Sequence, residues 1–220
     1  MVALKTFKNL TTERQAEIIA VCLEEFALHE YQTASLSTIV SNLKLAKGSF
    51  YRYFENKQTL YFFLFDYCTE VRLKNDKSFI KTETTDIFDL MLQHFESKIK
   101  FDKLFPLESA FLQNVLVERN NDELGNIQLK SKSKILVMIK NLVKKQVEIG
   151  NLRQDIDINV ISFLMLQIQI SIVDFIALNL NIDFRARIKT EKKLHNISEK
   201  KMLEISKQFI AVLKNGIIKL

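Results

Sequence analysis

Residues 36–60 read LSTIVSNLKLAKGSFYRYFENKQTL, and this stretch decides the fold. Apolar residues at helical spacing mark one face of a short helix that follows Ser35, and a second short helix begins at Lys47. In the second helix Phe50 and Phe54 lie one turn apart, so both are expected to point inward. The pattern predicts two short consecutive helices that share one apolar core.

The side of the second helix that faces away from the phenylalanines carries polar and basic residues. Two short helices joined by a tight turn and braced by a longer one are the geometry of a helix-turn-helix DNA reader. Lysine and serine at the start of such a helix reach base edges, whereas tyrosine hydroxyls and nearby helix starts suit phosphates. The predicted DNA-binding residues are Ser35, Ser37, Thr38, Lys47, Gly48, Ser49, Tyr51, Arg52, Tyr53, Asn56 and Lys57.

The segment LAKGSFYRYFENKQTL resembles the signature of the TetR family of bacterial one-component transcription regulators. The resemblance in residue pattern covers about residues 10–60, and the remainder is similar only in the number and length of its helices. It implies an all-α homodimer on a pseudo-palindromic operator, with a C-terminal effector domain and release of DNA when a ligand binds. The positions that match the family's backbone contacts are Tyr51, Tyr53 and Lys57, and those that match its base-reading positions are Lys47, Gly48 and Ser49.

Three positions depart from the family's pattern. The family usually has Gly where Glu30 stands and Thr where Ala34 stands, and it favours Gly in the turn where Lys44 stands. A lysine in the left-handed backbone region costs of order 1 kcal/mol, unless the turn differs slightly. These departures concern the docking of the first short helix rather than the fold.

The composition of the whole chain excludes several classes of protein. With 4 Gly and 1 Pro in 220 residues, the chain lacks the turn residues that an all-β fold needs. Cys22 and Cys68 lie in apolar helical patterns, which suits a reducing cytoplasm better than a disulfide scaffold. His29, His94 and His195 stand far apart, and no nucleophile–base pair or phosphate-binding loop is visible. We therefore expect no metal site, no cofactor and no enzymatic activity.

The net charge of +6 lies mostly near the C-terminus. Residues 181–220 carry 10 basic and 4 acidic side chains, whereas residues 1–60 carry 7 and 6. The argument for DNA therefore rests on local charge, since residues 44–57 hold four basic side chains against one acidic. The basic tail at residues 181–220, whose first part (181–195) is a predicted link between helices, could be a solvated face, a membrane-surface patch or an auxiliary DNA contact. Its interspersed acidic residues favour the first.

Helical periodicity predicts about nine helices in an all-α chain. The first three form a DNA-binding domain at residues 1–56, and the other six form an effector-binding and dimerisation domain at residues 57–220. Thr12 with Gln15 and Asn196 with Glu199 are the predicted capping pairs of the first and last helices. The predicted helices cover roughly residues 12–29, 36–43, 47–54, 57–79, 87–100, 106–119, 127–149, 158–180 and 197–218.

Two of these helices, at 158–180 and 197–218, have wide apolar stripes. Polar residues such as Gln167 and Asp174 interrupt the first, at a density that would be costly at the centre of a bilayer. We therefore expect an interface helix rather than a membrane span, with both helices forming a homodimer interface. The N-terminal sequence MVALKTFKNL has no apolar leader, which predicts a cytoplasmic protein.

Apolar side chains in the central helices are candidates to line an effector cavity, although each alone is more typical of a plain core. Such a lining favours a lipophilic or aromatic small molecule. The candidate ligand-binding residues are Phe88, Met91, Phe95, Phe105, Phe111, Phe163 and Gln167.

Taken together, these features predict a ligand-responsive, sequence-specific DNA-binding transcription regulator, as a homodimeric repressor released from its operator by an apolar or aromatic molecule. The alternative is a helical lipophile- or partner-binding protein whose N-terminal module no longer binds specific DNA. The intact polar face from Lys47 to Tyr53 argues against this alternative.

Overall fold

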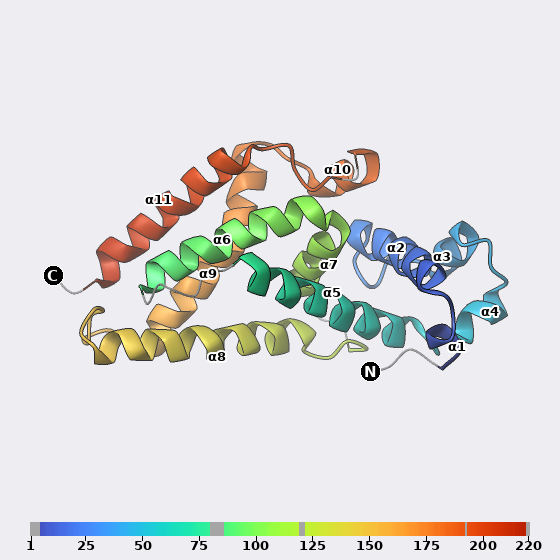
Figure 1. Ribbon diagram of the computed structural model, residues 1–220, viewed down its shortest axis with the longest axis horizontal. Coiled ribbons are helices and arrows are strands. Elements are labelled where there is room, and N and C mark those ends of the chain that lie inside the picture. The colour runs from blue at the N-terminus through green and yellow to red at the C-terminus, as the bar shows by residue number, and fades with distance from the viewer. Residues whose placement is uncertain (1–4, 80–85, 119–121, 192, 219–220) are drawn as a thin grey trace. The chain divides into compact units, whose positions relative to one another are not determined.

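The computed structural model describes residues 5–79, 86–118, 122–191 and 193–218 and has an all-α architecture (Figure 1). In these ranges eleven helices occur and no strand, the one extended pairing being an isolated bridge between Leu152 and Ile218. The predicted fold class is confirmed. The helices are α1 (Lys5–Lys8), α2 (Thr12–Leu28), α3 (Leu36–Asn42), α4 (Lys47–Tyr51), α5 (Lys57–Phe79), α6 (Ile87–Leu104), α7 (Pro106–Val117), α8 (Ile127–Glu148), α9 (Ile158–Asn179), α10 (Phe184–Glu191) and α11 (Glu199–Ile217).

Two helices exceed the predicted nine. α1 precedes the first predicted helix, and α10 lies in the basic segment 181–195, where a link was predicted wrongly. Both are short, four and eight residues, so periodicity over a long window does not detect them. Arg119, the predicted end of α7, lies outside the described residues.

The caps of two helices differ from the predicted ones by one or two residues. Thr11, not Thr12, caps α2, and its hydroxyl accepts a hydrogen bond of 3.3 Å from the backbone amide of Arg14. Ser198, not Asn196, caps α11, and its hydroxyl accepts a hydrogen bond of 3.3 Å from the backbone amide of Lys201. In both places two polar residues compete near the helix start, and the one whose oxygen reaches the amide three residues ahead becomes the cap.

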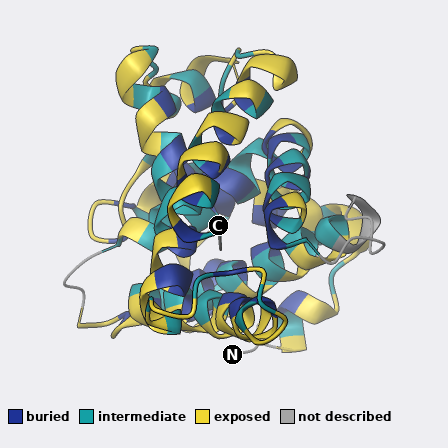
Figure 2. Ribbon diagram, turned by 90° about the vertical axis from the view of Figure 1, so that its left-hand side faces the viewer, coloured by how far each residue is buried: buried dark blue, intermediate teal, exposed yellow. Residues whose placement is uncertain are grey.

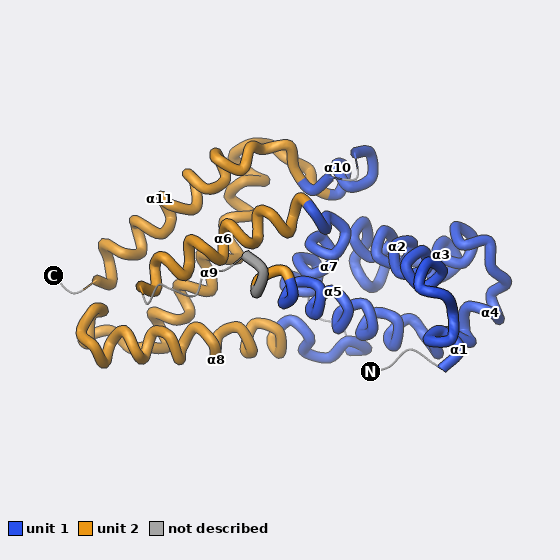
Figure 3. Tube along the Cα trace, viewed as in Figure 1, with its two compact units in different colours: residues 1–74, 104–128, 185–194 blue, residues 75–103, 129–184, 195–220 orange. Residues whose placement is uncertain are grey.

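The chain forms two compact units (Figure 3). Unit 1 comprises residues 1–74, 104–128 and 185–194, and unit 2 comprises residues 75–103, 129–184 and 195–220. Unit 1 therefore combines the N-terminal helices with most of α5, with α7 and with most of α10. The predicted boundary between a DNA-binding domain (residues 1–56) and an effector-binding and dimerisation domain (residues 57–220) is a division by function, whereas the two units are defined by packing. The domain boundary therefore stays a prediction.

Unit 1 is built on an aromatic core that lies beneath the stretch quoted above. Phe50 and Phe54 are each 1% exposed and share this core with Leu23, Ile39 and Leu60. The prediction that both phenylalanines point inward is confirmed. Because their side chains anchor α4 from behind, the opposite side of α4 is left facing solvent.

The turn between α3 and α4 is a Schellman motif whose left-handed residue is Lys44, with φ of 52°. The amide of Lys44 donates to the carbonyl of Ser41 at 3.0 Å, and the amide of Leu45 donates to the carbonyl of Val40 at 3.1 Å. Of the two sequence-based alternatives, a left-handed lysine and a different turn, the first is therefore correct.

A Lys44→Gly variant is expected to unfold at a higher temperature, because glycine adopts a positive φ without the Cβ clash that lysine suffers. The expected gain is about 1 kcal/mol in the free energy of unfolding. Thermal unfolding followed by circular dichroism measures it. Lys44→Ala is the matched control, because it removes the charge and keeps the strain, and its Tm should match that of the parent. A lower Tm for Lys44→Gly would contradict this account of the turn.

Unit 2 has its own apolar core, formed by residues of α6, α8, α9 and α11. Buried residues gather on the inward sides of these helices and exposed residues on their outward sides (Figure 2). Gly150, with φ of 80°, follows α8, and its amide donates a hydrogen bond of 3.1 Å to the carbonyl of Val147. The left-handed glycine thus ends α8.

α9 is the one helix in the described part of the chain that is long and apolar enough to cross a membrane by length and composition. Its most apolar window has a mean hydropathy of 2.0, and 33% of that window is buried within the single chain. Ile161, Met165 and Leu166 face the core of unit 2, whereas Phe163, Leu164 and several other apolar residues stay exposed. α9 therefore packs on one side only.

Candidate nucleic-acid interface

The start of α3 supplies three of the predicted DNA-binding residues. Ser35 is the N-cap, and its hydroxyl accepts a hydrogen bond of 3.2 Å from the backbone amide of Thr38. Its own amide donates at 2.7 Å to Oε1 of Glu25, a buried carboxylate on α2. The side chains of Ser37 and Thr38 are exposed. The first turn of α3 is therefore fixed through Ser35 and offers two free hydroxyl-bearing side chains to solvent.

The outward side of α4 holds the predicted base-reading residues. Lys47, Gly48 and Arg52 are exposed, Ser49 is half-buried, and 39% of Tyr51 is accessible. Neither Lys47 nor Arg52 forms an ion pair with any residue that the structure describes, so both cations remain available to an anionic partner. The face combines cations, a hydroxyl and an aromatic ring.

Tyr53 differs from Tyr51 in that its ring is half-buried. It packs edge-on against Phe7 of α1, with ring centroids 6.2 Å apart, and belongs to the margin of the core of unit 1. The sequence places the two tyrosines on one outward face, but Tyr53 follows the end of α4 and turns its ring toward the core. Tyr53 thus has a packing role that the sequence did not indicate.

Asn56 stands at the N-cap position of α5. Its Oδ1 accepts two hydrogen bonds from Thr59, one of 2.7 Å from the backbone amide and one of 3.0 Å from the hydroxyl. The side-chain oxygen is therefore committed to capping, and the Nδ2 amide N–H groups of the exposed side chain are left for an anion.

Asn56→Asp and Asn56→Ala are expected to separate the capping role of this residue from its predicted phosphate contact. Aspartate keeps the oxygen that caps α5, so its stability should stay within about 0.5 kcal/mol of the parent, whereas alanine should lose about 1 kcal/mol. The aspartate variant also loses the side-chain amide N–H donors and places a negative charge at the DNA, so it should bind duplex more weakly than the alanine variant does. Urea unfolding and duplex titrations measure the two effects. Stronger duplex binding by Asn56→Asp than by Asn56→Ala would contradict the phosphate contact.

Lys57, the first residue of α5, is held in place by the link between α2 and α3. Its Nζ donates to the carbonyl of Gln32 at 3.2 Å and lies 4.6 Å from the centre of the Tyr31 ring. Partial burial lowers the pKa of Lys57, and the carboxylates of Glu123, Glu25 and Glu118 oppose that shift. The predicted phosphate contact is therefore a pre-positioned ammonium rather than a freely moving one.

Tyr31 connects this lysine to the segment that follows α7. Its hydroxyl donates to Oε2 of Glu123, and its backbone amide donates at 3.3 Å to Oε2 of Glu118. Burial and the bond to Glu123 raise the pKa of Tyr31 above its ordinary range, so the hydroxyl keeps its proton. These contacts join residues 87 and 92 positions apart, and no local sequence pattern could have indicated them.

The seven candidate ligand-binding residues are not gathered in one cluster. Phe88, Met91 and Phe95 of α6 lie in the core of unit 2, where Nζ of Lys214 stands 5.2 Å from the centre of the Phe88 ring. Phe111 is fully buried in the core of unit 1. The remaining three are Phe105 and Gln167, which are half-buried, and Phe163, which is 50% exposed.

Other chemistry in the described part of the chain is sparse. No group of three or more His, Cys, Asp or Glu side chains in those residues could hold a metal ion. Cys22 and Cys68 are both buried, and burial raises the pKa of each thiol well above its usual range. Neither cysteine is therefore in the reactive thiolate form near neutral pH.

Comparison with known protein families decides the identity of the N-terminal helices. Residues 18–62, from α2 to the first turns of α5, match the profile of the family described as "Bacterial regulatory proteins, tetR family". This segment belongs to the tetR family. The match spans α3, α4 and the two phenylalanines behind them, so the tetR-family segment coincides with the exposed face described above.

The fold of the whole chain is that of solved tetR-family regulators. A TetR family transcriptional regulator from Chloroflexus aurantiacus J-10-FL is similar over 100% of both chains, with 22% identity and a TM-score of 0.83. The ketosteroid transcriptional regulator KstR2 of Mycobacterium tuberculosis is similar over 96% of this chain and 98% of its own, with 12% identity and a TM-score of 0.61. AibR, solved with isovaleryl coenzyme A and operator DNA, is similar over 90% and 97%, with 14% identity and a TM-score of 0.62. No curated protein sequence matches this chain.

Proposed function

We propose that this protein is a homodimeric transcription regulator that binds a pseudo-palindromic operator through α3 and α4 and leaves it when a small molecule binds. The observation that carries the proposal is the exposed row of Lys47, Tyr51 and Arg52, unpaired within the described residues and backed by the buried Phe50 and Phe54. Such a row on a short helix matches what a major groove accepts.

The residues divide into two roles at the DNA. Lys47 and Ser49 of α4 read base edges. Phosphates are bound by side chains from three places: Ser37 and Thr38 on α3, Tyr51 on α4, and Asn56 and Lys57 at the start of α5. A Cβ added at Gly48 would meet no protein atom within 4 Å, so the fold itself does not require a glycine at this position. The proposed role of Gly48 is to let α4 approach the duplex closely.

Dimer formation is proposed through α9 and α11, over residues 158–180 and 197–218. The support is the apolar surface that these helices expose, most of all Leu178 at 81% and Val212 at 77%. Phe175 and Phe209 meet edge-on at 5.2 Å and join the exposed sides of the two helices into one surface. Packing two copies of this surface together would remove it from water.

Coupling to a ligand is proposed through the contacts of Tyr31. An effector that displaces the segment after α7 would pull Glu118 and Glu123 away from Tyr31, and the ring beneath the Lys57 ammonium would move with it. To lower the occupancy of the operator from nearly complete to nearly zero, the effector must bind the DNA-free form of the protein more favourably by up to ~5.5 kcal/mol.

The effector is proposed to be lipophilic or aromatic. The buried Phe88, Met91 and Phe95 of unit 2 support this class, since they offer apolar contacts and no charge. One of the similar structures is a ketosteroid regulator, and ketosteroids are lipophilic; another, AibR, was solved with isovaleryl coenzyme A, which joins a short apolar acyl group to a charged carrier. A cytoplasmic location is part of the proposal, because a bacterial regulator must reach its operator DNA.

Selection of duplexes from a random pool tests the proposed function. The parent protein should enrich one pseudo-palindromic sequence, and Lys47→Ala should discriminate that sequence from a scrambled one about 5- to 150-fold less well. Lys145→Ala, an exposed lysine of α8, is the control and should discriminate as the parent does. A parent protein that enriches no sequence at any salt concentration would overturn the proposal.

A further inference from the structure

The N-terminal helix α1 is fastened to the end of α4. The hydroxyl of Thr6 donates to the backbone carbonyl of Arg52, the C-cap residue of α4. Phe7 is 2% exposed, and the centre of its ring lies 5.1 Å from that of Phe54 and 5.3 Å from that of Phe63. Together with the edge-on contact to Tyr53, these interactions hold α1 beside the helix proposed to enter the groove (Figure 1).

Two lysines flank the buried phenylalanine on this short helix. Lys5 and Lys8 are three residues apart, which places them on one side of α1, and both are exposed. Neither ammonium has an ion-pair partner in residues 5–79, 86–118, 122–191 or 193–218. Gln15 donates to the carbonyl of Lys8 at 3.3 Å and so fixes the end of the helix.

We propose that Lys5 and Lys8 form an additional phosphate-binding site for duplex DNA, outside the helix-turn-helix. The inference rests on the proposed function, because it needs α4 to lie against the duplex. Duplex DNA carries one negative charge per about 1.7 Å of its axis, so two ammonium groups held beside the C-terminal end of α4 meet the backbone that borders the groove. The contacts of Thr6 and Phe7 order α1 before DNA arrives, so binding costs little further ordering.

A purely structural role for α1 makes a different prediction. In that role Phe7 packs in the core and Thr6 donates its hydrogen bond to the carbonyl of Arg52, and neither contact uses the ammonium of Lys5 or Lys8. Removing both charges should therefore leave the fold intact. If the lysines bind phosphates, their loss should weaken all duplexes alike, because phosphate contacts carry no sequence information.

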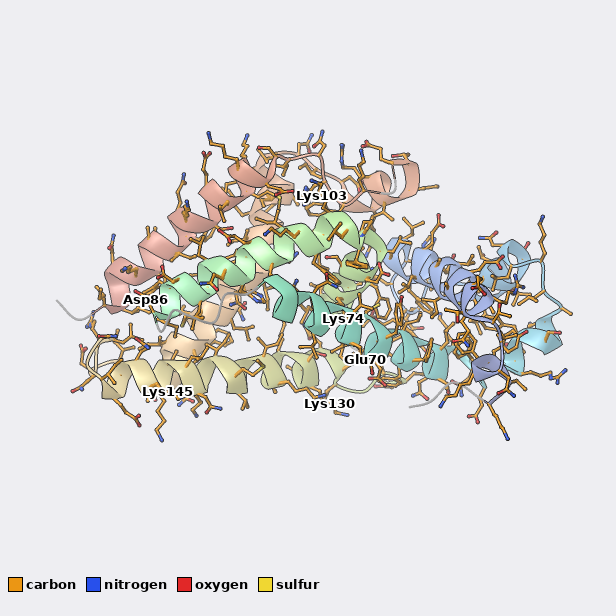
Figure 4. The ribbon with its side chains drawn as sticks, viewed as in Figure 1. Glu70, Lys74, Asp86, Lys103, Lys130 and Lys145 are labelled. Atoms are coloured by element: carbon orange, nitrogen blue, oxygen red, sulfur yellow. The ribbon has the colours of Figure 1, made fainter. Side chains whose placement is uncertain are left out.

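Salt-dependent duplex titration of a Lys5→Ala/Lys8→Ala variant tests the site. The slope of log affinity against log salt should become shallower by about 1.8, or roughly 0.9 for each lost contact. Affinity should fall by the same factor on the selected and the scrambled duplex, and the Tm should not change. The matched control is Lys130→Ala/Lys145→Ala, which removes two exposed lysines of α8 (Figure 4) and should keep the parent slope.

The outcomes separate this inference from the proposed function. A parent slope in Lys5→Ala/Lys8→Ala, beside lost discrimination in Lys47→Ala, would overturn the additional site and leave the proposed function standing. A loss restricted to the selected duplex would also overturn it, since that result assigns the lysines to base reading. Absence of salt-dependent duplex binding by the parent protein would overturn both.

Discussion

A Phe54→Ala variant is expected to lose about 3–5 kcal/mol in the free energy of unfolding of its N-terminal unit. The ring is 1% exposed, and its centre lies 5.1 Å from that of Phe7, 5.7 Å from that of Phe50 and 5.2 Å from that of Phe63. Truncation leaves a cavity at the point where α1, α4 and α5 meet. Urea unfolding measures the loss, and duplex binding should disappear with the fold.

Tyr51→Phe is the matched variant on the other side of α4. It removes one exposed hydroxyl, so stability should stay within about 0.5 kcal/mol of the parent while duplex affinity falls. The pair should thus separate: Phe54→Ala loses stability and binding together, and Tyr51→Phe loses binding alone. A Phe54→Ala protein with the parent's unfolding midpoint would contradict the assignment of this ring to the core.

Replacing both Leu178 and Val212 with glutamate is expected to yield a monomer whose operator affinity is about 10²–10⁴-fold lower than that of the parent. The two side chains are the most exposed of the large apolar residues described for the chain, and each lies on a helix of the proposed dimer surface. Charge at these positions opposes burial. A monomer then loses the gain in affinity that comes from binding two half-sites at once.

Val137→Glu is the control for this dimer variant. Val137 is 59% exposed on α8, outside the proposed interface, so its substitution should leave a dimer with the parent's operator affinity. Light scattering after size-exclusion chromatography gives the mass of each species. A double variant that remains dimeric would show that α9 and α11 do not form the interface.

Local patterns were enough to predict the reader helices. One turn separates Phe50 from Phe54, and this spacing correctly predicted both as buried. The left-handed conformation of Lys44 was one of two alternatives implied by the resemblance to the TetR family, and its φ of 52° agrees with it. The burial of the two phenylalanines follows from the repeat of their own short helix, which the local sequence carries.

Contacts between residues far apart in the chain could not be predicted from the sequence. Tyr31 meets Glu118 and Glu123, and no periodicity links those positions. α1 has too few residues for a helical pattern to appear, and its one apolar anchor, Phe7, reads as an isolated residue. Both features fasten predicted DNA-binding residues in place, so the support of the site was the part that sequence reasoning missed.

The candidate effector residues show a related restriction. Four of them, Phe88, Met91, Phe95 and Phe111, are buried. Helical spacing did not indicate which core each residue joins, and Phe111 belongs to unit 1 whereas the other three belong to unit 2. Assigning a residue to a core depends on how helices distant in sequence pack, which periodicity does not encode.

Hydroxyl-radical footprinting of the parent protein on its selected duplex tests the central claim most directly. Two copies of α4 that enter successive major grooves should protect two patches on one face of the duplex, with centres 10–10.5 base pairs or about 34–36 Å apart. Protection of a single patch, or of two patches on opposite faces, would contradict paired reading by a dimer.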